Sequence, residues 1–173
     1  KDSLVSVGLL RSQPKVATWS LDHRKQLEPL VAQIGLSHFW VERTWDRQIL
    51  DLNKHDAYNG HVPISAIFSA VGTIVAVLTG YRDLVVSNES SANEPNLVYE
   101  GVEINHQFSK SLEYEKLYQA HLTRHFGESL RYYSLLRPFT ELRIAELFAK
   151  NDFEKYKTNF SSCNRAFTHD STG

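Results

Sequence analysis

The amino-acid sequence predicts an α/β fold: a doubly wound, mostly parallel sheet with helices on both faces. Segments with apolar residues at helical spacing alternate along the chain with short runs rich in β-branched and aromatic residues. The 173 residues, 42% of them hydrophobic, are enough for one domain with a sizeable core. Because strands separated by helices pair in parallel, this alternation favours a covered parallel sheet.

The first elements already alternate in this way. Residues 1–11 carry a helical stripe of leucine and valine, and residues 16–20 are typical of a short buried strand. A second helix is expected to begin at Asp22, whose carboxylate suits an N-cap, and to end at Gly35, which tolerates positive φ. Residues 38–44 then predict another strand.

A polar stretch over residues 46–59 is expected to hold a short helix and a loop. The clearest helix of the chain follows over residues 64–78, where large apolar residues recur every three or four positions. Alanine and glycine fill its other faces, so we expect this helix to contact protein on most sides. It is too short and too often interrupted by Ser, Gly and Thr to span a membrane.

The second half continues the alternation. Residues 84–87 predict a strand that runs into a polar loop over residues 88–94, and residues 131–136 predict the last strand. A helix is expected through Leu112 and Leu122 between them. After the last strand, Thr140 is expected to cap a final helix that carries Ile144, Leu147 and Phe148.

Composition limits the classes of function. Nineteen Lys and Arg balance twenty Asp and Glu, which argues against binding nucleic acid by bulk charge. The single cysteine, Cys163, excludes an internal disulfide and a cysteine-based zinc cluster within these residues, and favours a cytoplasmic location. The absence of methionine suggests a piece of a longer protein. We divide it into an α/β nucleotide-binding domain, residues 1–150, and the start of a C-terminal segment, residues 151–173.

Polar residues that follow strands are the first candidates for a site, since ligands of parallel sheets bind beyond the carboxyl ends of the strands. The loops after Ser20, Thr44, Ser87 and Leu136 meet this criterion. Lys1, Asp2 and Ser3 precede a helix, whose free N–H groups can hold an anion. The alternative is that Asp2 or Ser3 only caps that helix.

Five stretches of the sequence carry a resemblance to a known family. Lys1-Asp2-Ser3 is similar to the end of the pyrophosphate-binding loop of PP-loop ATP pyrophosphatases, whose glycines and preceding strand would lie ahead of Lys1. More specifically, the chain resembles the UDP-N-acetyl-α-D-muramoyl-L-alanyl-L-glutamate epimerase (MurL-like) family. The resembling stretches, in order, are KDSLVSVGLL (1–10), SNESSANE (87–94), EINHQFSKSLEYE (103–115), LRPFTELRIAELF (136–148) and FSSCNRAF (160–167).

The resemblance implies a PP-loop-like fold, ATP and Mg²⁺ as cofactors, and a UDP-MurNAc-dipeptide as substrate. Enzymes of this family invert the terminal L-Glu of a peptidoglycan precursor and release AMP and pyrophosphate. A free carboxylate opposes loss of the neighbouring α-proton, because a dianion would form. Transfer of AMP to the carboxylate gives an acyl-adenylate, which removes that charge and acidifies the α-proton. Acid and base groups near the α-carbon are then required.

The resemblance also assigns roles to individual residues. Lys1, Asp2, Ser3, Ser87, Asn88 and Arg137 are expected to bind the nucleotide, with Asp2 acting through Mg²⁺. Glu89, Glu94, His106 and Lys110 are expected to move protons or hold the substrate carboxylate. Each assignment has a plainer alternative: a surface turn for the glutamates, a hydrogen-bonded His106, and a surface ion pair with Glu141 for Arg137.

Other readings remain open at this point. A relative that adenylates another carboxylate, an amide or a tRNA base would share the nucleotide chemistry, and a nucleotide-binding domain without activity would share the fold. The balanced charge favours neither nucleic-acid nor membrane partners, and the oligomeric state is not predicted. Cys163 and the Gly60-His61 pair are weaker candidates, and His121 with His125 is expected to be a solvated helix face.

Overall fold

The computed structural model describes residues 1–44, 46–52, 54, 55 and 62–160. The helices are α1 (Asp2–Leu10), α2 (Glu28–Ile34), α3 (Gln48–Leu52), α4 (Ile64–Thr79), α5 (Leu112–Phe126), α6 (Glu141–Asn151) and α7 (Phe153–Tyr156). The strands are β1 (Ala17–Leu21), β2 (Ser37–Val41), β3 (Asp83–Val86), β4 (Leu97–Tyr99), β5 (Val102–Ile104) and β6 (Arg131–Ser134). Short 3₁₀ turns are η1 (Lys25–Leu27), η2 (Ser90–Asn93), η3 (Phe108–Lys110) and η4 (Gly127–Ser129).

The described strands pair two by two. β1 and β2 are parallel, with Trp19 opposite Phe39, and β3 and β6 are parallel, with Leu84 opposite Tyr132. β4 and β5 form a separate antiparallel pair. The predicted α/β class with parallel pairing is therefore confirmed, whereas the described residues form three two-stranded sheets and no continuous doubly wound sheet.

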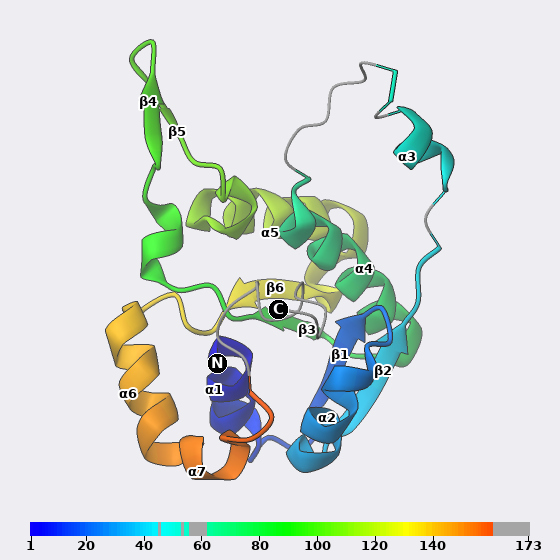
Figure 1. The fold of residues 1–173 in the computed structure, drawn as a ribbon, viewed down its shortest axis with the longest axis vertical. Coiled ribbons are helices and arrows are strands. Elements are labelled where there is room, and N and C mark those ends of the chain that lie inside the picture. Colours follow the sequence, from blue (N-terminus) through cyan, green and yellow to red (C-terminus); the bar gives the residue numbers. More distant parts are fainter. Residues whose placement is uncertain (45, 53, 56–61, 161–173) are drawn as a thin grey trace.

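Helices lie on both sides of the β3–β6 pair, with α4 and α5 on one side and α1 and α6 on the other (Figure 1). Each side has its own apolar core. On the α4/α5 side, buried Leu84 and Tyr132 pack with Leu122. On the α1/α6 side, Leu4 and Leu136 pack in a cluster that also contains Ile34, Ile144, Phe148 and Tyr156. Tyr156 is fully buried there, so α7 contributes to the core formed by the earlier helices.

Local signals set most helix ends. Thr140 caps α6 by accepting a hydrogen bond from the backbone N–H of Arg143 at 3.3 Å, as predicted. Gly35 ends α2 at φ 71°, also as predicted. The N-cap prediction for Asp22 is wrong. Asp22 adopts φ 64°, and its carboxylate accepts from the Arg43 guanidinium at 2.9 to 3.1 Å, so this loop is held by a long-range ion pair.

Helix α4 buries its small residues and exposes many of its large ones. Ser69 and Ala76 are buried, whereas Ile74 is 58% and Leu78 79% exposed within the described part of the chain. A Cβ at Gly72 would lie 2.8 Å from Leu84 Cδ1 and 3.0 Å from Trp19 Cζ2, so the strands approach the helix closely. The expectation that α4 contacts protein on most sides is therefore wrong for these residues.

The antiparallel pair β4–β5 was not predicted. Its two-residue turn, Glu100-Gly101, has positive φ at both positions, 50° and 78°, which matches the twist of a hairpin. The usual sequence signal for such a turn is Asn-Gly. Here the first position is a glutamate, which rarely adopts positive φ, so the sequence did not indicate the turn. The hairpin projects from the body of the molecule (Figure 1), and all its apolar side chains are exposed.

Among the described residues, no helix has both the length and the apolar character needed to cross a membrane.

Candidate functional site

The carboxyl ends of β3 and β6 lie side by side, since the two strands are parallel and in register up to Val86 and Ser134. The polar loop that begins at Ser87 and the turn that leads to Arg137 therefore leave the same edge, as the sequence predicted. The Ser134 hydroxyl donates to the backbone oxygen of Asn88 and fixes the first turn of the loop to β6. This edge is the framework of the candidate site.

The start of α1 is connected to α6. Lys1 Nζ lies 3.4 Å from Asp2 Oδ1 and 3.6 Å from Oε1 of Glu141, the first residue of α6. Asp2 Oδ1 is buried and has no hydrogen-bond partner among the described residues, although it lies in this ion pair. Ser3 is exposed in the first turn of the helix. The three residues thus place a cation, a carboxylate and a hydroxyl at one helix end.

A side-chain contact joins α1 to the loop after β3. The Ser6 and Ser87 hydroxyl oxygens are 2.8 Å apart, and Ser6 is buried. Ser6 lies one helical turn beyond Asp2 and Ser3. The contact therefore brings the predicted phosphate-binding helix next to the predicted substrate loop.

Glu89 and Glu94 line one small polar depression together with Ser91, Ala92, Asn96, Asn105 and Gln107. Glu89 Oε1 accepts a hydrogen bond from the Ser91 hydroxyl at 2.7 Å. Its other oxygen, Oε2, is buried and without a hydrogen-bond partner within the described residues. The structure thus brings the two predicted carboxylates to one place and leaves one oxygen of Glu89 uncommitted to any donor there.

In the sequence, the β4–β5 hairpin separates His106 and Lys110 from the loop over residues 88–94, yet both side chains contact residues that line the depression. The His106 ring bonds through Nδ1 to the side-chain oxygen of Asn96, which also lines the depression. Lys110 Nζ donates to Gln107 Oε1, another lining residue, at 2.9 Å. Both predicted residues therefore reach the depression through an intermediate amide.

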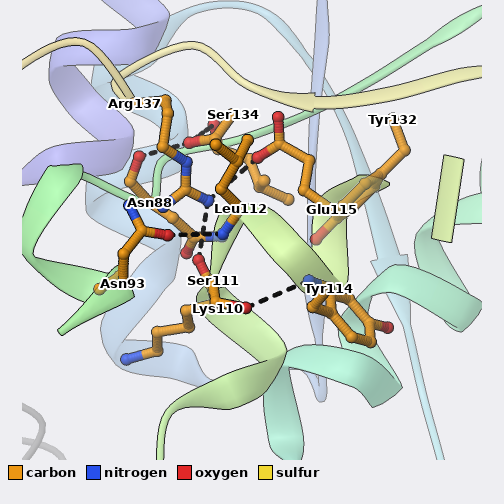
Figure 2. A network of polar contacts seen from close by, with 12 residues as sticks. Asn88, Asn93, Lys110, Ser111, Leu112, Tyr114, Glu115, Tyr132, Ser134 and Arg137 are labelled. Carbon is orange, nitrogen blue, oxygen red and sulfur yellow. Dashed lines mark hydrogen bonds and ion pairs between the residues drawn. The ribbon is translucent and has the colours of Figure 1, made fainter. Parts of the chain in front are cut away.

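Arg137 is almost buried, with 12% of its side chain exposed, and it is surrounded by acceptors. Its guanidinium donates to the backbone oxygens of Glu89 at 2.9 Å and Lys110 at 2.7 Å, and to Glu115 Oε2 at 3.0 Å (Figure 2). The surface pair with Glu141 that the sequence offered as an alternative is not among these contacts; the partner carboxylate is Glu115.

Two amide side chains near the site make hydrogen bonds that hold neighbouring segments of the fold together. Asn93 Oδ1 accepts from the backbone N–H of Leu112 at 2.6 Å, at the start of α5 (Figure 2). Asn105 Nδ2 donates to the Ala92 oxygen at 2.9 Å. Short polar side chains in loops commonly do this, but no local pattern reveals a partner 19 or 13 residues away.

The described residues contain no cluster of three or more His, Cys, Asp or Glu that could hold a metal by itself. A cation shared with a phosphate group needs fewer protein ligands, since Mg²⁺ is often bound by one or two carboxylates and substrate phosphates. The buried Asp2 Oδ1 is an oxygen ligand of the kind that Mg²⁺ prefers. Asp2 at the start of α1 therefore fits the predicted role.

A second polar group lies on the β1–β2 pair. The His38 ring is hydrogen-bonded on both nitrogens, to Thr18 Oγ1 at 2.7 Å and to Ser20 Oγ at 3.1 Å. Burial lowers the pKa of His38, and the nearby His23 lowers it further. Trp40 stands against both rings, 4.3 Å from His38 and 4.2 Å from His23 between centroids. No candidate residue was assigned here from the sequence.

Comparison with known proteins identifies the family of the chain. The model of the family described as "MurL N-terminal domain" matches residues 1–135. The chain belongs to the MurL family. It is 40% identical over 168 residues to a protein of Xanthomonas oryzae pv. oryzae (strain MAFF 311018) named UDP-N-acetyl-alpha-D-muramoyl-L-alanyl-L-glutamate epimerase. The matched part is 96% of this chain and 37% of that relative.

Two further MurL relatives of the same name show similar identity. The protein of Micromonospora sp. (strain ATCC 39149) is 42% identical, with 37% of its length covered, and that of Salinispora tropica is 39% identical, with 36% covered. The chain thus spans little more than a third of the relatives that it matches. No solved structure matches it significantly. Cys163 and the Gly60-His61 pair lie outside the described residues of this MurL chain.

Proposed function

We propose that this chain is the N-terminal part of an ATP-dependent epimerase that converts the terminal L-Glu of UDP-MurNAc-L-Ala-L-Glu to D-Glu. The observation that carries the proposal is the similarity to three proteins named as this epimerase, each over 96% of the chain. An isomerase of a peptidoglycan precursor is therefore the activity to test first, in the full-length protein.

The proposed reaction begins with transfer of AMP from ATP to the terminal carboxylate of the substrate, with release of pyrophosphate. A base then removes the α-proton, an acid returns a proton to the opposite face, and water cleaves the acyl-AMP bond to leave the D-Glu carboxylate and AMP. Masking the carboxylate charge lowers the cost of the carbanion. The protein must hold pyrophosphate, bind the carboxylate and place proton-transfer groups beside the α-carbon.

Residues at the start of α1 suit the nucleotide. Lys1, Ser3 and the free N–H groups of the first helical turn offer donors to a pyrophosphate, and the buried Asp2 Oδ1 offers an oxygen ligand to Mg²⁺. When bound, Mg²⁺ would shield phosphate charge during transfer. The contact of Ser6 with Ser87 supports a shared site for nucleotide and substrate, with Asn88 beside it.

Residues around the polar depression suit the α-carbon chemistry. Glu89, with one buried oxygen that lacks a donor, is the first choice for a proton-transfer group, and Glu94 shares its depression. His106 and Lys110, which contact the lining amides Asn96 and Gln107, are candidates for acid and for carboxylate clamp. Substrate binding would have to replace these amide contacts, as the side chains are engaged in the free protein.

The finer fold assignment belongs to the same proposal. In a PP-loop-like, doubly wound sheet, the β1–β2 and β3–β6 pairs would be parts of one sheet, joined by a strand between β1 and β3. Two features support this. Trp19 of β1 and Leu84 of β3 both press against Gly72 of α4, so the two pairs lie under the same helix. Both pairs are parallel, as that sheet requires.

The test uses the full-length protein with ATP, Mg²⁺ and UDP-MurNAc-L-Ala-L-Glu in deuterium oxide. We expect pyrophosphate release only when the dipeptide nucleotide is present, and D-Glu that carries deuterium at the α-carbon. Release that requires tRNA instead would indicate a base-modifying relative, and binding of ATP without release would indicate a non-enzymatic domain. Either result, or racemisation without deuterium uptake, would refute the proposal.

A further inference from the structure

The contacts of Arg137 extend to two of the residues proposed for the chemistry. One guanidinium nitrogen, Nη1, holds the backbone oxygen of Glu89, and another, Nη2, holds the backbone oxygen of Lys110. Glu89 follows β3 and Lys110 ends η3, so the two lie 21 residues apart and on either side of the β4–β5 hairpin. A single side chain thus fixes the main chain of both.

Glu115 completes the arrangement from a third element. Its Oε2 lies 3.0 Å from Arg137 Nη2, and only 14% of its side chain is exposed. Glu115 belongs to the first turn of α5, whose N-cap Ser111 directly follows Lys110 and accepts from the Tyr114 N–H at 3.1 Å. The carboxylate therefore anchors the guanidinium to a capped helix end, and it balances the buried positive charge.

We infer that Arg137, held by Glu115, is a positioning residue that sets the distance between Glu89 and Lys110 in the substrate site. This inference rests on the proposed function of those two residues. The Nη atoms of Arg137 hold two backbone oxygens and a carboxylate, so Arg137 acts on the substrate site through the loops that carry Glu89 and Lys110. The nucleotide contact that the sequence predicted for Arg137 stays a prediction.

The geometry also explains why arginine is used. Lysine carries its three donors on a single nitrogen, whereas the planar fork of arginine places donors on two separate nitrogens, Nη1 and Nη2, which here hold Glu89 and Lys110 at the same time. The contacts in Figure 2 spread from Arg137 to the Lys110 backbone on one side and to Glu115 on the other. Replacing Arg137 by Lys keeps the charge that balances Glu115 but removes the fork, which makes it the informative substitution.

The experiment compares Arg137→Lys, Glu115→Gln and Glu115→Ala in the full-length protein. Arg143→Lys is the matched control, because Arg143 forms an exposed pair with Glu146 on α6. Backbone amide exchange is measured over residues 88–94 and 108–112, and steady-state kinetics give kcat and KM for the dipeptide nucleotide and for ATP. Amide exchange requires no turnover, so it tests whether Arg137 holds the two segments even if the proposed activity is absent.

For Arg137→Lys we expect amide exchange in both segments to rise by about tenfold or more, as when a net-stabilising contact is lost. We also expect the KM for the dipeptide nucleotide to rise while the KM for ATP stays within about twofold. Glu115→Gln, which keeps an acceptor, should fall between wild type and Glu115→Ala. The inference is overturned if exchange in these segments matches that of Arg143→Lys, or if only the KM for ATP changes. Absence of epimerisation in wild type would instead refute the proposed function.

Discussion

Ser6 Oγ and Ser87 Oγ lie 2.8 Å apart, although 81 residues separate them in the sequence. The first belongs to α1 and the second directly follows β3. This contact connects the helix proposed to bind the nucleotide with the loop proposed to bind the substrate. Its strength can be measured directly, because each hydroxyl can be removed alone and together with the other.

A double-mutant cycle of Ser6→Ala and Ser87→Ala should give a coupling of about 1 kcal/mol in the free energy of unfolding, the usual net value of such a hydrogen bond. Urea unfolding followed by tryptophan fluorescence measures it. Ser12→Ala, at an exposed position just after α1, serves as the control and should change stability by less than about 0.5 kcal/mol. Additive effects of the two substitutions would show that the hydroxyls do not interact.

Gly72→Ala should destabilise the fold even though alanine favours helices. The added Cβ would meet Leu84 Cδ1 at 2.8 Å and Trp19 Cζ2 at 3.0 Å, and overpacking of this kind costs about 1 to 3 kcal/mol. Ala70→Ser, on the exposed side of the same helix, is the control. A Gly72→Ala protein as stable as wild type in thermal unfolding would mean that the helix and the two strands are packed less closely than described.

Tyr132→Phe should weaken the core between α4 and the β3–β6 pair. The Tyr132 hydroxyl is hydrogen-bonded to Ser69 at 3.0 Å, and Ser69 is fully buried, so the loss should cost about 1 to 2 kcal/mol. Tyr99→Phe, in the exposed hairpin, is expected to have no measurable effect. Chemical denaturation of the two variants side by side provides the measurement.

The same tyrosine makes stability depend on alkaline pH. Burial raises the pKa of Tyr132 from its ordinary value of 10.0 to about 12. Between these values the unfolded chain has lost a proton that the folded chain retains, so stability falls as the pH rises from about 10 towards 12. Melting temperatures of wild type should fall more steeply over this range than those of Tyr132→Phe; parallel curves would contradict the assignment.

On the acidic side, protonation of His38 should reduce the stability of the fold as the pH falls below neutral. Burial lowers the pKa of His38 from its ordinary 6.5, and the groups that face it are His23, Thr18, Ser20 and the Trp40 ring. The unfolded chain therefore takes up a proton first, and stability is lost as the pH falls from about 6.5 through the folded-state pKa.

The measurement is the melting temperature from pH 7.5 down to 5, compared between wild type and His38→Gln. His125→Gln, at an exposed position of α5, is the control. The His38 variant should show the shallower decline, whereas equal slopes in all three proteins would place the titration elsewhere.

How far the sequence predicts this structure depends on the range of the interactions involved. Periodicity and caps are local, so α1, α4, α5, α6, the end of α2 at Gly35 and the start of α6 after Thr140 were predicted close to what is observed. The polar loops after β3 and β6 could be placed at one edge of the sheet without knowing the strand order, because the carboxyl ends of parallel strands lie at the same edge.

Other features depend on partners far away in the chain. Asp22 was predicted to be a cap, but its carboxylate pairs with Arg43. The Glu115 carboxylate and the two backbone oxygens that Arg137 contacts could not be predicted from the sequence either. The turn at Glu100 uses a residue that seldom adopts positive φ, so the hairpin leaves little local trace. Neither periodicity nor composition contains such long-range pairings, which is why the roles of these residues required coordinates.

On α4 small residues are buried and many large ones are exposed, and this reverses the usual expectation of which substitutions a helix tolerates. On a helix that buries its large apolar residues, shortening a leucine leaves a cavity and is harmful, whereas the exposed small residues can be enlarged at little cost. Here, within the described chain, positions Ile74 and Leu78 can be shortened at little cost, whereas Ser69, Gly72 and Ala76 set the closest approach of helix and strands and admit no bulk. A saturation screen along this helix should therefore find its strictest positions among its smallest residues.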